Sequence, residues 1–275
     1  MSDGGRHVAL IVSYAGTAYA GFQRQPGRVT VQSRLEEALS DLAGQPVRLR
    51  GAGRTDAGVH AAGQVVDAWL PASVRLPAAR LPLALGPRLP ADIGAAAAFE
   101  VAPAFDARRS AVSKRYRYLI WRGPTPSPFF RAHAWGYAGP LALAAMEQAA
   151  QALIGRHDFR AFAGAARPVE DAHRTVHDCA VWVDGPWLAV EVEADGFLYR
   201  MVRAIVGTLV EVGRGVRRPQ EVARLCAGAP RSAGGPSVPP QGLCLLWVRY
   251  PDGSGLPPPG PAWPPPPGPA PERAL

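Results

Sequence analysis

The sequence predicts an α+β fold with largely antiparallel sheets, and three observations support this prediction. Strand-like and helix-like segments are mixed without the strict βαβα alternation that a parallel sheet requires. Val8, Leu10, Val12 and Tyr14 recur at every second position, which is the period of a half-buried strand. The segment Cys179 to Glu193 contains Asp184-Gly185, a dipeptide typical of the turn in an antiparallel hairpin.

The first half of the chain continues with one clear helix and several short strands. Thr30 is a typical N-cap, and the apolar stripe that starts at Val31 and is followed by Gly44 predicts a helix. We expect short strands from Val47, over 64–70 and over 93–101. Residues 76–85 have helical spacing, but Pro77 and Pro82 weaken that prediction.

The second half repeats this mixture. Residues 110–122 alternate and predict a long strand with two different faces. We expect an Ala-rich helix over 141–153, a central apolar helix over 197–212, a short helix over 219–227 and a closing strand over 243–250. These elements predict two domains, 7–105 and 106–250, followed by a tail over 251–275. Because 11 of the last 25 residues are Pro, we expect an extended, mobile tail; a ligand for an SH3-type domain is the less favoured alternative.

The composition favours a cytoplasmic protein and is compatible with a polyanionic partner. The 275 residues carry a formal net charge of +8, which is compatible with nucleic-acid binding but equally with simple solubility. Neither a membrane span nor a signal peptide is expected, since long apolar runs are broken and the N-terminus has no apolar core. Three cysteines, Cys179, Cys226 and Cys244, are far apart and suit reduced thiols better than disulfides or a zinc site.

The most informative segment lies between two expected strands, from Gly51 to Ala61. Small residues surround Arg54, Thr55 and Asp56, and small residues allow the backbone to approach a ligand closely. An Arg two positions from an Asp favours the ionised carboxylate, which is a usable nucleophile or base. The alternative is an ordinary turn, because Asp and Gly are common turn residues.

Eight consecutive residues of this segment, Gly53-Arg-Thr-Asp-Ala-Gly-Val-His60, are similar to the active-site signature of the TruA family of pseudouridine synthases. Further similarities, spread from residue 7 to residue 250, are found at Gly21–Gln25, Val31-Gln32, Leu35–Leu39, Phe105–Arg108, Lys114–Tyr118, Met201–Arg203, Ile205–Gly207 and Gly242-Leu243. The chain departs from the pattern at Ala204, where the family usually has Asn, and at Gly86–Pro90, which lacks an Asn before Leu-Pro.

The resemblance implies the roles of five residues. The catalytic aspartate of the family corresponds to Asp56 and its active-site arginine to Arg54. The tyrosine that stacks on the target base corresponds to Tyr116, and Arg203 and Leu243 are expected near the pocket. His60 belongs to the signature, but a structural hydrogen bond is the expected role.

The resemblance also implies a fold and an activity. The fold is two RRM-like or ferredoxin-like α/β domains with mainly antiparallel sheets, forming a pseudouridine synthase fold with the active cleft between them. The activity is isomerisation of uridine to pseudouridine at positions 38, 39 and 40 of the tRNA anticodon stem-loop, by a homodimer, with no cofactor and no metal. Asp56 would either attack C1′ of the sugar or remove the C2′ proton. We expect the basic neighbours to hold RNA phosphates: Arg108, Arg109, Lys114, Arg115 and Arg117.

Three other functions are considered. A pseudouridine synthase can act on a different RNA, and an RNA-binding or chaperone protein needs no catalysis at all. A metal-dependent hydrolase would need ligands such as His173 and His177, whose i,i+4 spacing suits zinc only on a helix. The residues that follow are predicted to be a strand, and the segment contains no HExxH motif, so the metal site is disfavoured.

Overall fold

The computed structural model describes residues 5–125, 127–164 and 170–259, and most of the predicted Pro-rich tail lies outside these ranges. The described residues form two compact units. The first unit contains residues 5–112 and 245–259, and the second contains residues 113–244. The final strand therefore belongs mostly with the first unit, whereas the sequence interpretation grouped it with residues from 106 onward.

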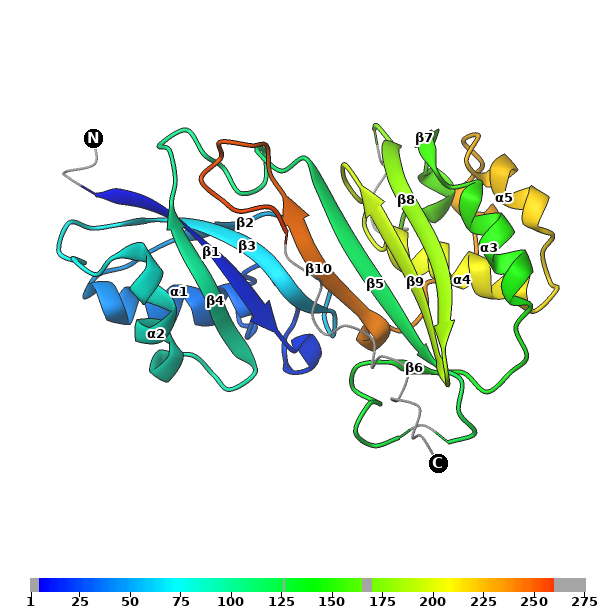
Figure 1. Cartoon of the computed structure of the whole chain (residues 1–275), viewed down its shortest axis with the longest axis horizontal. Coiled ribbons are helices and arrows are strands. Elements are labelled where there is room, and N and C mark those ends of the chain that lie inside the picture. The colour runs from blue at the N-terminus through cyan, green and yellow to red at the C-terminus, as the bar shows by residue number, and fades with distance from the viewer. Residues whose placement is uncertain (1–4, 126, 165–169, 260–275) are drawn as a thin grey trace, which may run out of the picture. The chain divides into compact units, whose positions relative to one another are not determined.

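The first unit is built on an antiparallel sheet. Strand β1 (Arg6–Tyr14) lies between β4 (Ile93–Glu100) and β3 (His60–Leu70), β2 (Leu49–Gly51) pairs with the other edge of β3, and β10 (Leu243–Arg249) follows β3 in the strand order. The register places Val8 opposite Ala68 and Leu10 opposite Val66. Helices α1 (Val31–Ala43) and α2 (Leu81–Leu85) pack in this unit (Figure 1). All pairings among β1 to β4 are antiparallel, as predicted.

The helices of the first unit begin and end where local sequence dictates. The Thr30 side chain accepts a hydrogen bond from the Ser33 amide, and Gly44 ends α1 with a left-handed φ of 67°, which confirms the predicted caps. Helix α2 forms despite Pro82 because this residue occupies the first turn, where no backbone donor is needed, and Pro77 lies before the helix.

The second unit contains antiparallel strands in the order β5 (Ser113–Trp121), β9 (Trp187–Ala194), β8 (His173–Asp184) and β7 (Gly155–Asp158). The two-residue strand β6 (Trp135–Gly136) adds to β5 in parallel. Helices α3 (Leu143–Gln151), α4 (Met201–Gly213) and α5 (Pro219–Leu225) gather together in this unit (Figure 1). Helix α4 is buried over nearly its whole length, as its apolar sequence predicted.

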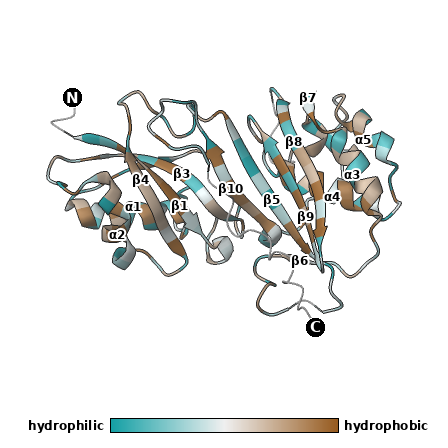
Figure 2. Ribbon diagram, viewed as in Figure 1, coloured by the Kyte–Doolittle hydropathy of each residue, from teal (hydrophilic) through white to brown (hydrophobic). Residues whose placement is uncertain are grey.

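The structure changes several predicted boundaries. Strand β3 begins at His60 rather than at 64, and β8 begins at His173, six residues before the predicted hairpin. Helix α4 begins at Met201 rather than at 197, because Arg200 adopts a left-handed backbone with φ 58°. Gly155, predicted to end a helix, instead opens the unpredicted strand β7. Figure 2 shows that the first half of β5, which includes Lys114 and Arg115, is largely hydrophilic.

Six short 3-10 turns complete the described structure, at Gly16–Ala18, Ala78–Arg80, Gly86–Arg88, Arg160–Phe162, Arg231–Ala233 and Pro240–Gly242.

Candidate active site

The glycine-rich segment after β2 is a loop whose backbone is held in place by neighbouring chain segments. The Ala52 amide donates to Val65 O at 2.8 Å, and the side chain of the fully buried Gln64 donates to Gly53 O at 3.0 Å. The loop is therefore anchored to β3 by both main-chain and side-chain hydrogen bonds. The sequence motif did not identify Gln64, although a polar residue in an apolar strand was a usable signal.

Buried hydrogen bonds fix the residues on both sides of Asp56. The hydroxyl of Thr55 is 2.8 Å from the hydroxyl of Tyr14, which lies at the end of β1. At the start of β3, the Gly16 amide donates to His60 Nδ1 at 3.1 Å, which is a structural hydrogen bond of the kind expected for His60. A short loop held at both ends keeps a catalytic side chain in one geometry, which is a requirement of efficient catalysis.

Two glycines of the neighbouring segment let it approach the Asp56 loop closely. Gly21 has φ 97°, and a Cβ at this position would lie 2.7 Å from Thr55 O. A Cβ at Gly16 would lie 1.9 Å from Val59 O. The Phe22 amide uses this proximity to donate to Thr55 O at 3.0 Å. Gly16 and Gly21 are thus required because no larger residue fits against the loop.

The two predicted residues of the loop differ in environment. Asp56 is half-buried, and its main-chain carbonyl accepts a hydrogen bond from the Val59 amide at 3.1 Å. Arg54 is exposed, and its Nε donates to Gln23 Oε1 at 3.1 Å. Gln23 belongs to the early loop that the family resemblance identified, so this hydrogen bond joins two of the matching motifs.

The other predicted site residues lie in the second unit. Tyr116 on β5 is 6% exposed and meets the ring of Phe197 edge-on, with 5.0 Å between ring centroids. Phe197 was predicted to be helical, but it precedes α4 in a non-helical segment that places it against Tyr116. The sequence motifs did not identify Phe197.

Arg203 and Leu243 are both buried. Arg203 lies in the first turn of α4, is 8% exposed, and its Nε donates to Val238 O at 2.8 Å. Leu243, 6% exposed, is the first residue of β10. Ala204 is fully buried, and its carbonyl accepts a hydrogen bond from the Thr208 hydroxyl at 2.8 Å. The methyl group of Ala204 therefore fits an apolar position in the core of this unit.

The expectation that Arg115 and Arg117 hold RNA phosphates is corrected by the structure. Arg115 donates to Glu191 at 3.0 Å, Glu193 at 3.0 Å and Asp178 at 2.7 Å, and Arg117 donates to Glu191 at 2.7 Å. Glu193 and Glu191 lie opposite Arg115 and Arg117 on β9, and Asp178 lies on the next strand, β8, opposite Glu193. Burial opposes the charged form of Arg115, but hydrogen bonds to Glu193 and Glu191 raise its pKa above the usual range.

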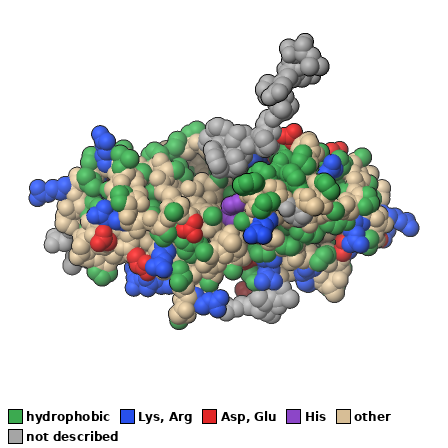
Figure 3. Space-filling model, turned by 90° about the horizontal axis from the view of Figure 1, so that it is seen from below, with side chains coloured by type: hydrophobic (Ala, Val, Ile, Leu, Met, Phe, Trp, Pro, Cys, Tyr) green, Lys and Arg blue, Asp and Glu red, His purple; other side chains and the backbone are tan. Residues whose placement is uncertain are grey.

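The other basic candidates remain available to solvent. Arg108 and Arg109 are exposed in the first unit, and Lys114 is half-buried in the second. The molecular face in Figure 3 carries Lys and Arg at scattered positions, with Asp and Glu between them. The net positive charge is thus not gathered into one continuous basic patch on that face.

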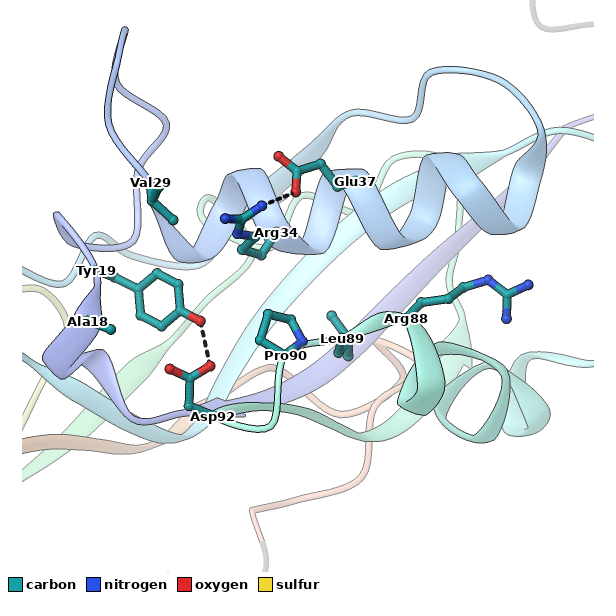
Figure 4. Close-up of a pocket in the computed structure, with 9 residues that line it drawn as sticks. All are labelled: Ala18, Tyr19, Val29, Arg34, Glu37, Arg88, Leu89, Pro90 and Asp92. Atoms are coloured by element: carbon teal, nitrogen blue, oxygen red, sulfur yellow. Dashed lines mark hydrogen bonds and ion pairs between the residues drawn. The ribbon is translucent and has the colours of Figure 1, made fainter.

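A hollow of about 400 Å³ in the first unit is lined by both acidic and basic side chains (Figure 4). The Tyr19 hydroxyl donates to Asp92 at 2.5 Å, and burial together with this carboxylate raises the pKa of Tyr19. Arg34 and Arg88 pair with Glu37 and Asp41. Because the arginines of the hollow are paired with carboxylates, it lacks the unpaired positive charge that a phosphate site requires.

Metal ligation and thiol chemistry find little support in the described residues. Within these ranges, no group of three or more His, Cys, Asp or Glu side chains is arranged to hold a metal ion. His173 and His177 lie on β8, where positions four apart are separated by about 13 Å. Burial raises the pKa values of Cys179 and Cys226 to about 12, so these thiols stay protonated near neutral pH.

Comparison with known proteins identifies the class of this molecule. A profile of the family described as "tRNA pseudouridine synthase" matches residues 10–108 and 149–251, which include the Asp56 loop. The fold and the matched segments together define a pseudouridine synthase.

Relatives then identify the family. A protein from Moorella thermoacetica named tRNA pseudouridine synthase A is 45% identical over 88% of this chain and 98% of the relative. One of the same name from Geobacter sulfurreducens is 44% identical over 89% of this chain and 100% of the relative. The chain belongs to the tRNA pseudouridine synthase family.

A solved Cbf5-Nop10-Gar1 complex contains a chain with 13% identity and a TM-score of 0.33, covering 74% of this chain and 45% of that one. In the described part of the protein, no helix has the length and apolar character needed to cross a bilayer.

Proposed function

We propose that this protein isomerises uridine to pseudouridine at positions 38, 39 and 40 of the tRNA anticodon stem-loop. The observation that carries the proposal is the Asp56 loop. This loop contains the family signature, and its backbone is held through hydrogen bonds of Gln64, Thr55 and His60 that are buried or partly buried. A binding protein without catalysis needs no half-buried carboxylate in a rigid loop next to an anionic ligand. The names of the relatives support tRNA as the substrate.

The chemistry at the sugar requires one reactive group from the protein. The bond between N1 of uracil and C1′ breaks, the base turns, C5 bonds to C1′, and the C5 proton is lost while N1 regains one. Asp56 acts at the sugar, either by attacking C1′ or by removing the C2′ proton, because carboxylates stabilise or trap electron-poor sugar carbons. Reactants and products contain the same atoms, so the overall reaction consumes no co-substrate.

The base must leave its stack before it can react, and the remaining site residues serve this step. Extrusion of one nucleotide costs a few kcal/mol and requires replacement contacts. Tyr116 stacks on the extruded uracil, and its hydroxyl assists removal of the C5 proton. Arg54, exposed on the Asp56 loop, occupies the vacated space or pairs with Asp56. Arg203 and Leu243 complete the substrate-binding group.

The proposal includes the state and the place in which the enzyme works. A homodimer grips one tRNA with both subunits, and Arg108 and Arg109 contact the RNA backbone. The compartment is the cytoplasm, which the buried protonated thiols of Cys179 and Cys226 suit. Sedimentation of the purified protein, with and without tRNA, measures the oligomeric state.

The position specificity is tested with three tRNA transcripts, each of which carries uridine at a different one of positions 38, 39 and 40 and another base at the other two. The expected result is pseudouridine at the single uridine of each transcript and none in a transcript that lacks all three. A transcript modified only outside the anticodon arm would instead support an enzyme with a different RNA target. Inhibition by EDTA would support the metal-dependent alternative.

A further inference from the structure

A carboxylate in the first unit is buried where no reaction step uses it. Asp67 on β3 has a side chain that is only 1% exposed. Its Oδ2 lies 2.8 Å from His7 Nε2 and accepts hydrogen bonds from Arg50 Nε at 3.1 Å and Nη2 at 2.6 Å. Its Oδ1 accepts the Ala107 amide at 2.9 Å. Asp67 therefore links strands β1 and β2 to the connection between β4 and β5.

Arg50 extends this link to a second carboxylate. Its Nη1 donates to Asp106 Oδ2 at 3.0 Å while the other side of the guanidinium binds Asp67. Hydrogen bonding to Asp67 raises the pKa of Arg50 against the opposing effect of burial. A planar guanidinium that donates to two carboxylates holds both in fixed positions.

Asp106 in turn organises the backbone that follows it. Its Oδ1 accepts the amides of Arg108 and Arg109, both at 2.9 Å. Its own amide donates to the Ser110 hydroxyl at 3.2 Å, and the Ser110 amide returns to Asp106 O at 2.9 Å. Burial opposes ionisation of Asp106, but these two amides and the Arg50 guanidinium hold the pKa of Asp106 below its usual range. The turn is also held from β10, because the hydroxyl of Tyr250, just after that strand, donates to Ala107 O at 2.6 Å.

The turn presents two exposed arginines on a backbone that is already ordered. Arg108 and Arg109 are exposed, whereas Ala107 and Phe105 are buried. A loop that is fixed before binding loses less conformational freedom when it meets a ligand. Asp106 itself carries negative charge close to these arginines, which is unfavourable near RNA unless a cation such as Arg50 offsets it.

We propose that Asp106, tied through Arg50 to the buried Asp67, is a positioning residue that fixes the 106–110 turn so that Arg108 and Arg109 meet RNA phosphates. This inference rests on the proposed tRNA function and adds a determinant of substrate binding to it. Removal of the negative charge of Asp106 should strengthen RNA binding if only simple electrostatics matters. Loss of positioning should instead weaken RNA binding, which is what the proposal predicts.

The experiment compares Asp106→Ala, Asp106→Asn and the control Asp41→Ala in pseudouridine formation on tRNA. Asp41 also pairs with one arginine, Arg88, so the control removes the same charge from an exposed ion pair. We expect Asp106→Ala to raise KM about tenfold with kcat within about twofold, because ordering of the turn is lost and chemistry is not. Asp106→Asn keeps an oxygen acceptor for the two amides and should give an intermediate KM. Asp41→Ala should leave KM unchanged or lower.

The salt dependence of tRNA binding separates positioning from stability. Loss of two phosphate contacts should reduce the slope of log K against log salt by about 1.5 in Asp106→Ala. Asp106→Ala should add little to a variant that already lacks Arg108 and Arg109, because non-additivity marks a shared effect. An unchanged KM and slope in both Asp106 variants, with thermal melts showing folded protein, would overturn the inference. Wild-type protein that neither binds nor modifies tRNA would instead overturn the proposed function.

Discussion

The Asp56 loop and the polar face of β5 both contain charged residues that the sequence marks as candidates, but the two regions differ in what surrounds those charges. The Asp56 loop is held by hydrogen bonds and close backbone contacts, and Asp56 is half-buried. On β5, Arg115 and Arg117 are enclosed by carboxylates from β9 and β8. A cluster of charges in a sequence therefore indicates an available charge only when its spatial partners are known.

Asp56→Ala is the strongest test of this difference between the Asp56 loop and the polar face of β5. If the loop exists to hold this carboxylate, the variant loses activity by about 10³-fold or more while tRNA affinity changes only a few fold. Single-turnover assays and filter binding on the same preparations measure both quantities. Asp56→Asn, with nearly the same shape, should be as inactive, because it lacks the charge. Appreciable activity in either variant would move the chemistry away from this loop.

The close approach of the loop is tested by Gly21→Ala. The new Cβ would lie too close to Thr55 O, and the alanine would have to adopt a φ of 97°. We therefore expect displacement of Asp56 and a loss of kcat of about 10²-fold. Gly27→Ala is the matched control, because its φ is 67° but nothing lies within 4 Å of the added atom. The control should lose only about 1 kcal/mol of stability and keep its kcat. Equal effects in the two variants would show that backbone strain alone, and not the contact, matters.

On β5, we expect a substitution to reduce the stability of the fold and to leave tRNA binding nearly unchanged. Arg117 is 8% exposed and also lies 5.5 Å from the ring of Trp182. Arg117→Ala leaves Glu191 with fewer partners, so we expect a loss of about 2–3 kcal/mol in the free energy of unfolding. The salt dependence of tRNA binding should change little. Arg34→Ala, which removes an exposed ion pair with Glu37, is the control and should cost less than about 1 kcal/mol. A reduced salt slope in Arg117→Ala would return this arginine to the RNA-binding group.

The smallest effect concerns acid stability. Asp106 has a lowered pKa in the folded protein, so its contribution to stability is present above the usual carboxyl pKa and is lost as pH falls through the lower folded value. The difference in melting temperature between wild type and Asp106→Asn should therefore shrink below about pH 4. A difference that stays constant from pH 7 to pH 3 would contradict the assigned ion pair with Arg50.

Features governed by neighbouring residues were predictable from the sequence. Thr30 and Gly44 mark the two ends of α1 because caps depend on residues within one turn. The turn before Trp187 predicted the antiparallel pairing of β8 with β9 for the same reason. The Asp56 loop was identified because its chemistry lies in consecutive residues.

Features that depend on distant partners were not predictable. The carboxylate that pairs with Arg117 lies 74 positions away, and no local pattern gives that register. Arg200 adopts a left-handed backbone that a non-glycine residue rarely takes, which shortened α4. The links from Asp67 through Arg50 to Asp106 join three separate segments of the first unit, so motif reading could not find them.

The central claim is tested most directly by mapping pseudouridine in unmodified tRNA after incubation with purified wild-type protein or Asp56→Ala, without any added cofactor. The account predicts pseudouridine in the anticodon arm with wild type and none with the variant, although both bind the tRNA. Tight binding without pseudouridine on any tRNA would contradict the account and leave an RNA-binding protein, and Ala204→Asn would then be the first reversion to examine.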